Sequence, residues 1–421
     1  MADILSRTTP ATPRRGRIRR ALRWSALGAA SLLLALLALF LVTGCAAFGG
    51  TLEGQRLVRA QQSPQWSQGQ FQNPQPLWAD SRGAWRRLLF GSTPDGQRPD
   101  APVPVVHTDP ALLESAPASG LRVTWFGHSS ALVEIDGSRV LVDPFWSERA
   151  SPVSWAGPKR WFAPPIALAD LPPIDVVVVS HDHVDHLDYG TIVALRGGNT
   201  RFVVPLGIGA HLEMWGIPAA RITELDWWQQ AQVGTLAVVA TPARHGSGRV
   251  LDTKHNHTLW AGFALIGPHH RAWYSGDTGL HDTLDRIGRE YGPFDVTLVE
   301  AGQYDSLWPD THLGPELAVE AHRRVQGRVM IPVHWALIGL APHPWTEPAE
   351  RVLAAAACQG VSVRIPRPGE SVEPTVPGSV QRWWPRQAWR TAAQAPVLAT
   401  RDGDPAHRVE APACMDGMAA R

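Results

Sequence analysis

The sequence predicts an α+β fold in which two β-sheets are covered by helices. Short stretches of strand character recur from residue 121 onward, and stretches with helical spacing appear between them, mainly in the second half. Several of these strands end directly in His or Asp. Strands that run in meanders and are then followed by helices are typical of layered sheets with helices outside.

The first group of strands begins with an alternating stretch at 121–126. Residues 131–135 and 139–142 flank Asp136-Gly137, a pair that favours a tight hairpin turn. The run Asp175–Val179 is apolar and β-branched, which indicates a fully buried strand. Further along the chain we expect strands at 201–204 and 222–225 and a helix at 207–215.

The second group of strands alternates with helices. Pro315 opens a stretch of helical spacing, in agreement with the preference for proline in the first helical turn. We expect strands at 236–240, 257–266, 271–275, 295–299 and 328–331, and helices at 280–290 and 315–324. The strands at 271–275 and 328–331 lead directly into Gly276-Asp277 and Pro332-Val333-His334.

The buried strand 175–179 leads into a dense group of metal-ligating side chains. His181, His183, Asp185 and His186 provide four potential ligands within six residues. One residue separates His181 from His183, so on an extended segment both point the same way. A solvated loop is the alternative, but four such residues at a strand end indicate a metal site. Imidazole and carboxylate together suit zinc and other borderline divalent ions.

Three other potential ligands also follow predicted strands. His245, Asp277 and His334 each come directly after a strand that is expected to end nearby. Taken singly, His245 or His334 is more often an ordinary residue than a ligand. Because parallel or mixed sheets gather their sites at strand ends, we expect these residues to meet the histidine cluster at one edge.

Length and charge bound the organisation of the rest of the chain. The 421 residues carry a net charge of +1, which gives no general reason to expect a nucleic-acid partner. We expect an extension at 46–115 that packs on the core, with a short helix near 82–90 and a Pro-rich linker. A catalytic domain then spans 116–371, and a disordered tail spans 372–421. Because Cys414 lies in this tail, we do not expect a structural disulfide between Cys358 and Cys414.

The N-terminus has the pattern of an export signal. Six arginines between Arg14 and Arg23 precede an uncharged apolar stretch from Trp24 to Val42, which is followed by small residues. Val42-Thr43-Gly44-Cys45 resembles a bacterial lipobox, so residues 1–45 are expected to be a signal that ends at a lipidated Cys45. An uncleaved transmembrane anchor is the alternative. Either way we expect a bacterial envelope protein tethered to the non-cytoplasmic side of a membrane.

The ligand order resembles that of the metallo-β-lactamase-fold hydrolases. Their motif His-x-His-x-Asp-His, followed by separate His, Asp and His residues, is present here. From Phe71 to Ser371 the chain is similar, more narrowly, to the N-acylphosphatidylethanolamine-hydrolysing phospholipase D family. The stretches that carry this narrower resemblance are 71–74, 120–128, 149–152, 157–160, 171–175, 224–228, 276–279, 292–295 and 369–371.

The resemblance implies an αββα sandwich with two divalent metal ions, most simply Zn²⁺, with Mn or Fe as alternatives. The first ion is then expected on His181, His183 and His245. The second is expected on Asp185, His186 and His334, with Asp277 as the bridging ligand. Neutral imidazoles leave the positive charge of the ions largely uncompensated. A water held between two such ions loses a proton near neutral pH and becomes a nucleophile.

Other positions are expected to support the metal ligands or the substrate. His312 corresponds to a family histidine near the substrate phosphate, and it is expected to stabilise a phosphoryl oxygen or protonate the leaving alkoxide; a surface histidine is the alternative. We therefore expect Asp277, Asp185 and His312 to be the catalytic residues. His128 and Asp143 are expected to orient ligands through hydrogen bonds, with simple turn capping as the alternative.

The chain departs from the phospholipase resemblance at positions expected to line a substrate pocket. Ile338 stands where the family has an aromatic residue, and Glu300 and Gln303 replace less polar residues. The segment from Tyr304 to His312 is also shortened. We therefore expect Glu300, Gln303, Tyr304, Trp335 and Ile338 to line the acyl or head-group pocket.

Three functions follow as hypotheses. The first is a membrane-tethered phosphodiesterase of phospholipase D type that attacks phosphorus with a hydroxide bridging the metals. It would hydrolyse N-acylphosphatidylethanolamine-like lipids to phosphatidate and an N-acylethanolamine. The second is a lactonase or another ester or amide hydrolase on the same fold. The third is a non-catalytic metal-binding lipoprotein of the envelope. The expected partners are a phospholipid or other phosphodiester and a membrane surface, and a homodimer is left open.

Overall fold

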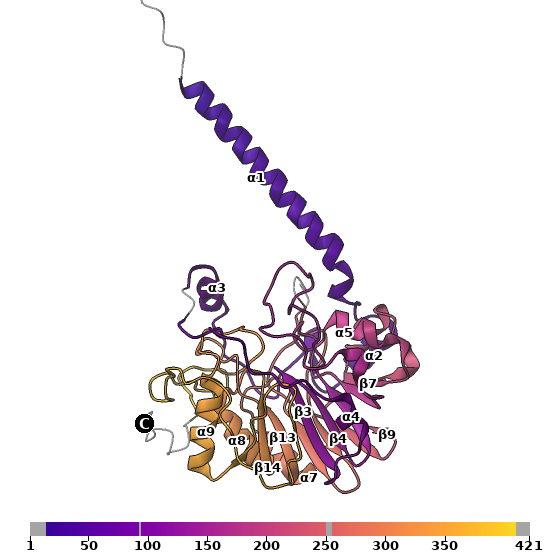
Figure 1. The fold of residues 1–421 in the computed structure, drawn as a ribbon. Coiled ribbons are helices and arrows are strands. Elements are labelled where there is room, and N and C mark those ends of the chain that lie inside the picture. Colours follow the sequence, from indigo (N-terminus) through magenta and orange to yellow (C-terminus); the bar gives the residue numbers. More distant parts are fainter. Residues whose placement is uncertain (1–13, 92–93, 250–254, 410–421) are drawn as a thin grey trace, which may run out of the picture. The chain divides into compact units, whose positions relative to one another are not determined.

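A computed structural model describes residues 14–91, 94–249 and 255–409 (Figure 1). The chain divides into two compact units, Met1–Ala47 and Phe48–Arg421. The first unit contains helix α1 (Arg14–Gly44), which is followed by a short 3₁₀ turn at Cys45–Phe48. This apolar helix is long enough to cross a membrane, and none of its apolar window is buried. It is compatible with the predicted signal or anchor.

The second unit is built on two large mixed sheets. In the described residues each has seven strands. The strands of the first sheet, in spatial order, are β16 (Ser371–Val372), β3 (Leu121–Gly127), β4 (Ser130–Ile135), β5 (Ser138–Val142), β6 (Val176–Val178), β7 (Arg201–Pro205) and β8 (Ile222–Leu225). Those of the second are β15 (Ser362–Val363), β14 (Gly327–Val333), β13 (Phe294–Glu300), β12 (Arg271–Tyr274), β11 (Gly262–Ile266), β10 (Leu236–Thr241) and β9 (Gln230–Val233).

Alternation along the strands divides the core into layers. In the first sheet Val133 and Val140 belong to the cluster that contains Val238 of the second sheet, so they face the interior of the sandwich. Their neighbours Leu132 and Leu141 belong to a separate apolar cluster on the other face. That outer cluster is completed by apolar side chains of helices α4 (Pro110–Glu114), α5 (Tyr189–Ala194) and α6 (Gly209–Met214).

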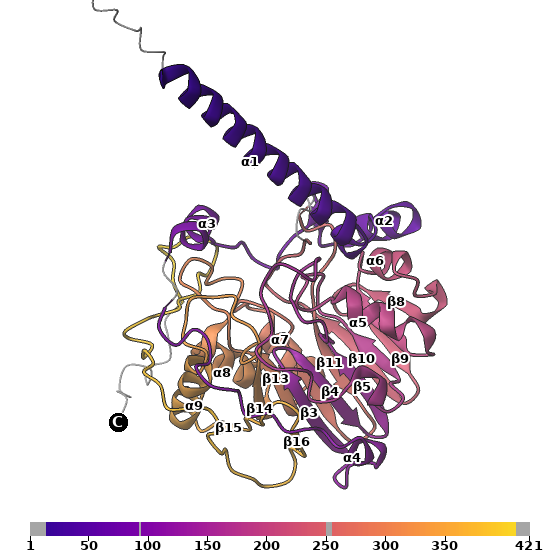
Figure 2. The same ribbon diagram turned by 45° about the horizontal axis from the view of Figure 1, so that its top comes forward.

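The second sheet has its own helical layer. Helix α8 packs on β13 and β14, and it also contacts α7 and α9. These three helices are α7 (Leu284–Tyr291), α8 (Gly314–Arg324) and α9 (Glu347–Gln359). Figures 1 and 2 show α8 and α9 beside β14, and Figure 2 shows α5 and α6 near β8. The predicted αββα sandwich is therefore confirmed.

All strands that lead to predicted site residues end at the same edge. Strands β5 and β6 are parallel, and β3 runs in their direction because it pairs antiparallel with β4, which pairs antiparallel with β5. The same relation aligns β10 with β12, which is parallel to β13 and β14. A backbone bridge joins the two sheets at this edge, where His128 and Trp335 pair. Loops after these seven strands can therefore meet there.

Most predicted elements are present, with shifted ends. The hairpin of β4 and β5 turns at Asp136-Gly137, where both residues have positive φ, as a tight two-residue turn requires. The strand expected at 257–266 begins only at Gly262, because Leu259 and Ala261 bond to the loops at Leu206 and Ser180 instead. The helix expected from 280 begins at Leu284. Strand β9 and helices α5 and α9 were missed.

The expectation of a disordered tail is wrong for residues 372–409. Strand β16 pairs with β3, and Trp383 stacks on Trp335 at a centroid distance of 5.5 Å. Trp384 and Thr400 are buried as well. The contacts of this segment are with distant residues, so its local composition could not reveal them. Cys358 is disulfide-bonded, contrary to expectation, and its candidate partner Cys414 lies outside the described residues.

The N-terminal extension lies on the same unit as the sheets. It contains helix α2 (Gly54–Gln61), the small hairpin β1 (Trp66–Ser67) and β2 (Gln70–Phe71), and helix α3 (Ser81–Phe90), which agrees with the helix expected at 82–90. Phe71 is fully buried, and the Asn73 amide group bonds the backbone of His245 in both directions, at 2.7 and 2.8 Å. The extension therefore reaches the predicted site.

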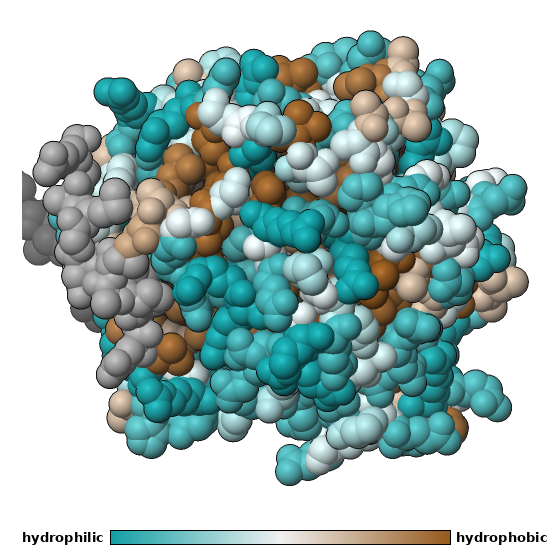
Figure 3. Space-filling model, turned by 90° about the horizontal axis from the view of Figure 1, so that it is seen from below, coloured by the Kyte–Doolittle hydropathy of each residue, from teal (hydrophilic) through white to brown (hydrophobic). Residues whose placement is uncertain are grey.

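The face of the molecule at the bottom of Figure 1 carries both polar and apolar residues. Polar residues cover most of this face, and apolar residues form smaller groups between them (Figure 3). Many large apolar side chains, such as Trp125, Trp260 and Trp273, are instead fully buried. The hydrophobic effect thus acts mainly between and behind the sheets, while the strand ends are left for polar side chains.

Candidate metal centre

The first group of ligands gathers at the end of β6. His181 Nε2 lies 2.8 Å from His183 Nδ1, and His245 Nε2 lies 3.3 Å from the same atom. One nitrogen of each of these three rings lies within 4.8 Å of the others. His245 arrives from the loop after β10, on the opposite sheet. The structure therefore brings together the three residues predicted for the first ion.

The second group lies beside the first. Asp185, His186, His334 and His128 each contribute one ligand atom to a buried group within 4.8 Å. His334 follows β14, so the two sheets contribute to this group as well. His128 was expected only to orient a ligand. It does bond Asp185 Oδ2, at 2.9 Å from its Nε2, and its ring also places a nitrogen among the candidate ligand atoms.

Asp277 lies between the two groups. Its Oδ2 atom is 3.1 Å from both His186 Nε2 and His334 Nε2. The same oxygen is 3.8 Å from His181 Nε2 and 3.9 Å from His245 Nε2. One carboxylate thus faces histidines of both groups, as a bridging ligand must.

Hydrogen bonds to the far ring nitrogens hold the histidines in place. His186 Nδ1 lies 2.6 Å from Asp143 Oδ2, and His245 Nδ1 lies 2.8 Å from the Thr311 carbonyl oxygen. His181 Nδ1 lies 2.9 Å from Ser180 Oγ, which in turn donates to Asp143. These acceptors favour the tautomers in which Nε2 is free to bind a metal. Asp143 thus contacts His186 directly and His181 through Ser180, and its role in orienting ligands stays a prediction.

Burial keeps most of the histidines neutral. Removal from water, together with the neighbouring histidines, lowers the pKa of His181 well below its ordinary value. Burial likewise lowers the pKa of His183, His245 and His334. The pKa of His186 is different: the carboxylates of Asp277 and Asp185 outweigh the effect of burial and raise it well above its ordinary value. Neutral imidazole is the form that binds metals, so most of the site is ready to bind one.

The residues fit divalent metal ions. His186 Nε2, His334 Nε2 and Asp277 Oδ1 are buried and have no hydrogen-bond partner among the described residues. Unsatisfied polar atoms are costly in a protein interior, and here three of them lie at the same spot. Histidine nitrogens and carboxylate oxygens are also the donor set that zinc and similar ions prefer. These buried clusters can therefore bind metal.

The backbone around the site is strained. His128, Asp143 and His334 have φ values of 51°, 35° and 67°, a region that side chains other than glycine rarely adopt. Such conformations persist only where surrounding contacts impose them, and they concentrate at functional sites. The bonds between His334 N and His128 O and between His128 N and Trp335 O, at 2.8 and 3.0 Å, are such contacts.

His312 lies at the side of both groups. Its ring stacks on His334 with centroids 5.2 Å apart and lies 5.1 Å from the ring of His245. Its Nδ1 is 3.1 Å from Glu300 Oε2. Glu300 and the other nearby carboxylates outweigh burial and raise the pKa of His312. The site thus places a partly exposed imidazole beside the candidate metal ligands.

Glu300 does not line a pocket, contrary to expectation. Its side chain is fully buried at the end of β13 and accepts hydrogen bonds from the Thr278 and Leu313 backbone amides, as well as facing His312. Its role is therefore to hold His312 and the two loops that flank it. Sequence reasoning missed this pairing, because twelve residues separate Glu300 from His312.

The remaining pocket candidates are also buried. The Gln303 side chain bonds the backbone of Ile338, Leu340 and Ala341, and the Tyr304 hydroxyl donates to Glu347. Trp335 stacks on both Trp125 and Trp383, and Ile338 is fully buried. These residues pack against or belong to the loop that follows His334. Gln303, Trp335 and Ile338 line a small hollow beside this loop, so their assignment to a substrate pocket stays a prediction.

A buried polar network supports the site from the C-terminal side. Arg244, the neighbour of His245, forms an ion pair with Asp310 at 3.0 Å, and it donates to the Thr400 carbonyl oxygen. Asp310 accepts a hydrogen bond from the Thr400 backbone amide at 2.6 Å. Sequence reasoning missed this network as well, because Thr400 lies in the segment expected to be disordered.

Comparison with known proteins agrees with this geometry. A family model described as the beta-lactamase superfamily domain matches residues 138–335. An uncharacterized protein of Mycobacterium tuberculosis is 48% identical over 376 residues, which cover 87% of this chain and 99% of that protein. N-acyl-phosphatidylethanolamine-hydrolyzing phospholipase D 1 of Caenorhabditis elegans is 40% identical over 229 residues, or 52% of this chain and 64% of that protein.

A third relative is matched over its whole length. A UPF0173 metal-dependent hydrolase of Methanopyrus kandleri is 30% identical over 256 residues, which cover 60% of this chain and 100% of that protein. The two-sheet fold and the His and Asp clusters at the strand ends agree with these similarities. The chain therefore belongs to the metallo-β-lactamase superfamily of metal-dependent hydrolases.

Proposed function

We propose that the protein is a membrane-tethered phosphodiesterase of phospholipase D type that uses two divalent metal ions. Its substrates are N-acylphosphatidylethanolamine-like lipids, and its products are phosphatidate and an N-acylethanolamine. The observation that carries the proposal is the position of Asp277 between two groups of histidines. The similarity to the phospholipase of Caenorhabditis elegans supports the choice of bond and substrate class.

The donor set suits a pair of cations. His181, His183 and His245 would hold one, most simply Zn²⁺, and Asp185, His186 and His334 the other, with Asp277 shared. When bound, two such ions supply Lewis-acid chemistry and lower the pKa of a coordinated water. Asp143 and the His245 contact to Thr311 keep the ligand nitrogens aimed at the site.

His312 would act directly on the substrate. Glu300 holds one ring nitrogen, so the other is free to donate a hydrogen bond or proton towards the site. In the proposed hydrolysis water adds to phosphorus, and the bond between phosphorus and the N-acylethanolamine oxygen breaks. Because the leaving alkoxide needs a proton, a histidine with a raised pKa beside the site is suited to provide it.

The apolar helix α1 supports the tethering part of the proposal. It is long enough to cross a membrane, and Cys45, the candidate lipidation site, is exposed with a free thiol. An enzyme held at a bilayer meets a lipid substrate in two dimensions, which raises the effective substrate concentration. Substitution Cys45→Ala separates lipidation from a plain anchor, because only a lipoprotein loses incorporation of labelled palmitate.

The test combines metal analysis with a substrate panel. The full chain, purified in detergent, is assayed on an N-acylated phosphatidylethanolamine, a bis-aryl phosphodiester and an acyl lactone. We expect two metal ions per chain and turnover of the phosphodiesters. The variant Asp277→Asn should lose this turnover, while Asp285→Asn, at an exposed carboxylate on α7, should retain it.

Other outcomes would assign the protein differently. Turnover of the lactone alone would replace the phosphodiesterase with an ester hydrolase on the same fold. Two bound metals without turnover of any member of the panel would indicate a metal-binding lipoprotein. A single bound metal with full phosphodiester turnover would refute the two-metal part of the proposal and leave the reaction intact.

A further inference from the structure

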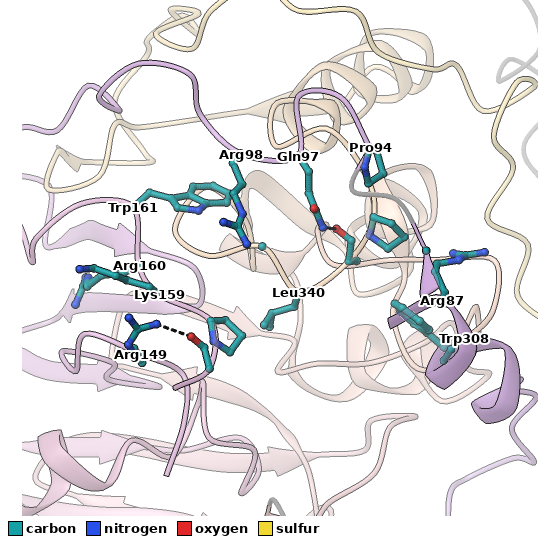
Figure 4. Close-up of a pocket in the computed structure, with 17 residues that line it drawn as sticks. Arg87, Pro94, Gln97, Arg98, Arg149, Lys159, Arg160, Trp161, Trp308 and Leu340 are labelled. Atoms are coloured by element: carbon teal, nitrogen blue, oxygen red, sulfur yellow. Dashed lines mark hydrogen bonds between the residues drawn. The ribbon is translucent and has the colours of Figure 1, made fainter. Parts of the chain in front are cut away.

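A large cavity lies beside the loop that follows His334. Its volume is about 600 Å³, and its walls come from three separate parts of the chain, within 84–98, 149–161 and 339–342, together with Trp308 (Figure 4). The backbone amide of Trp161 donates to the Leu337 carbonyl oxygen, and Gln97 Nε2 donates to that of Ala341. The cavity and the metal centre therefore share one loop, although none of the candidate metal ligands lines the cavity.

The charged side chains of the cavity all have the same sign. Among the described residues that line it, five are basic and none is acidic. The basic residues are Arg87, Arg98, Arg149, Lys159 and Arg160. Arg87 pairs with Asp305 and Lys159 pairs with Glu148, so carboxylates outside the cavity neutralise two of these charges. The other three form no ion pair with a carboxylate among the described residues.

Arg160 is the most unusual of the three. Only 7% of it is exposed, and its guanidinium donates to the carbonyl oxygens of Phe162, Trp146 and Ser147. Burial lowers the pKa of Arg160 to about 10. The negative charge of Asp188 acts in the opposite direction but does not offset this effect. The other contacts of Arg160 are with the rings of Phe145 and Phe162, at 5.7 and 6.0 Å from the ring centroids. A buried cation without a carboxylate in contact is costly unless an anion joins it. It belongs to the Gly-Pro-Lys-Arg stretch at 157–160, for which the metal chemistry gives no role.

Arg149 and Arg98 extend the positive charge to the mouth of the cavity. Arg149 donates to the carbonyl oxygens of Ser154 and Gly157, which holds its guanidinium in place. Arg98 is exposed and has no hydrogen bond or ion pair within the described residues. Figure 4 shows Arg98 beside Trp161, with Arg149 near Lys159. Arg149, which is held in place by carbonyl acceptors, and Arg98, which is free to move, can therefore both donate hydrogen bonds to one anion.

Apart from Gln97, the other side chains of the lining are apolar. Trp161, Trp308 and Leu340 lie on the walls, and 39% of Leu340 is exposed. Apolar side chains next to unpaired guanidinium groups match a ligand that has an anionic group and a hydrocarbon part. A free inorganic anion would leave this apolar surface in contact with water.

We propose that this cavity binds the phosphate group of an anionic lipid, with Arg98, Arg149 and Arg160 around the phosphate and the start of an acyl chain along Trp161 and Leu340. The site is separate from the metal centre, and it goes beyond the proposed reaction. Its occupant could be a bilayer component or the phosphatidate that the proposed reaction releases. Both carry the same chemical group, and binding does not depend on turnover.

The experiment measures binding without catalysis. Full-length protein in detergent is titrated calorimetrically with dihexanoyl phosphatidate, dihexanoyl phosphatidylcholine and inorganic phosphate. The same titrations are run on Asp277→Asn, Arg98→Gln and the double variant Arg98→Gln/Arg149→Gln. Arg323→Gln, at an exposed arginine of α8, is the matched control. Thermal unfolding of every variant checks that the fold is retained.

We expect phosphatidate to bind at least about tenfold more tightly than either of the other ligands, since it combines the anion with an acyl chain. Arg98→Gln should weaken phosphatidate binding severalfold and the double variant by about tenfold or more, while Arg323→Gln and Asp277→Asn bind as the wild type does. Retained binding in Asp277→Asn, together with lost turnover, separates this site from the proposed function.

Three results would overturn the proposal. The first is unchanged phosphatidate binding in a folded double variant. The second is binding that disappears in Asp277→Asn but not in the arginine variants, because the lipid would then be bound at the metal centre. The third is equal affinity for inorganic phosphate and phosphatidate, which would assign the cavity to a free anion.

Discussion

Asp143 determines the orientation of two candidate metal ligands without being one of the predicted seven. It is fully buried and accepts hydrogen bonds from His186 Nδ1, the Tyr274 hydroxyl, and both the amide and the hydroxyl of Ser180. Ser180 in turn accepts from His181. Burial and the Asp143 carboxylate raise the pKa of Tyr274 well above its ordinary value, so this hydroxyl stays a donor.

We therefore expect Asp143→Asn to weaken metal binding. An amide offers fewer acceptor sites than a carboxylate and would place two donor hydrogens among existing donors, so His186 and His181 would lose their fixed orientation. The loss should be about 10–100-fold in metal affinity, measured by competition with a chelator. Asp285→Asn serves as the control, and unchanged affinity in Asp143→Asn would show that the ligands are oriented by other contacts.

His312 gives a prediction that separates catalysis from metal binding. It contacts Glu300 through one nitrogen and stacks on His334, but it is outside the two predicted ligand groups. His312→Gln should therefore keep the metal content and lower kcat by about 10²–10⁴-fold on the phosphodiester substrate. Metal analysis and steady-state kinetics measure both effects. A variant that loses its metal in proportion to its activity would instead make His312 a ligand.

Buried His322 predicts a pH dependence of stability far from the site. Burial lowers its pKa from 6.5 to about 4, and its Nδ1 bonds Thr297 Oγ1 at 2.7 Å. The unfolded chain takes up a proton below pH 6.5 while the folded chain does not, so stability is fully present above pH 6.5 and falls as the pH approaches 4. From pH 7 to pH 5 this residue should remove about 2 kcal/mol from the free energy of unfolding.

Urea unfolding of chelator-treated protein at the two pH values measures this change. In His322→Gln the drop between pH 7 and pH 5 should be smaller than in the wild type by that amount. Comparison of the two proteins cancels the contributions of the other histidines. An identical drop in both would mean that His322 titrates alike in the folded and unfolded chains.

At the scale of elements, the loops after the strands are more tightly constrained than the strands themselves. Gly279 follows Asp277 in the loop after β12, and a Cβ atom there would lie 2.0 Å from the Asp310 carbonyl oxygen. Gly279 N donates to the Arg244 carbonyl oxygen at 2.7 Å. The loops that carry Asp277, His245 and His312 are therefore packed backbone to backbone, which leaves no room for a side chain.

Gly279→Ala should therefore destabilise the protein by about 1–3 kcal/mol and displace Asp277. Chemical unfolding measures the first effect, and a lower metal content measures the second. Gly197→Ala is the matched control, because its added Cβ meets nothing within 4 Å. Equal stability of the two variants would indicate that the loop relaxes without effect on the site.

The elements themselves were largely predictable, and the reason is physical. Strands such as β4, β5 and β6 have apolar β-branched residues and a strong turn between them, and these local properties decide their conformation. Histidine and aspartate at strand ends were informative because parallel strands end together. Glu300 was misassigned because the orientation of a side chain at a strand end depends on which backbone groups need a partner, and those groups come from distant residues.

At the scale of the molecule, the C-terminal segment is part of the structure that holds the site. Trp383 and Trp384 pack on Trp335, and Thr400 completes the network of Arg244 and Asp310. The segment is rich in Arg, Pro and Gln, so its composition favours a disordered chain. Only its long-range contacts, which local patterns cannot show, give it an ordered place.

A chain that ends at Pro374 should therefore be severely destabilised. It would expose Trp335 and leave the buried groups of Asp310 and Arg244 short of partners, with an expected cost of about 5 kcal/mol or more. Such a loss is comparable to the whole stability of many domains, so poor solubility and a lower thermal midpoint are expected. A chain that ends at Val409 keeps these contacts and is the control. Equal thermal midpoints would refute a supporting role.

The contact of Thr400 with Asp310 has a consequence for biosynthesis. The two residues are 90 positions apart, and all seven candidate metal ligands precede both Thr400 and Trp383 in the chain. During synthesis, every candidate ligand therefore leaves the ribosome before the C-terminal segment that packs against the site. Translocation in an unfolded state would postpone this closing step until the whole chain has crossed the membrane, where the choice of ion is set by the destination compartment.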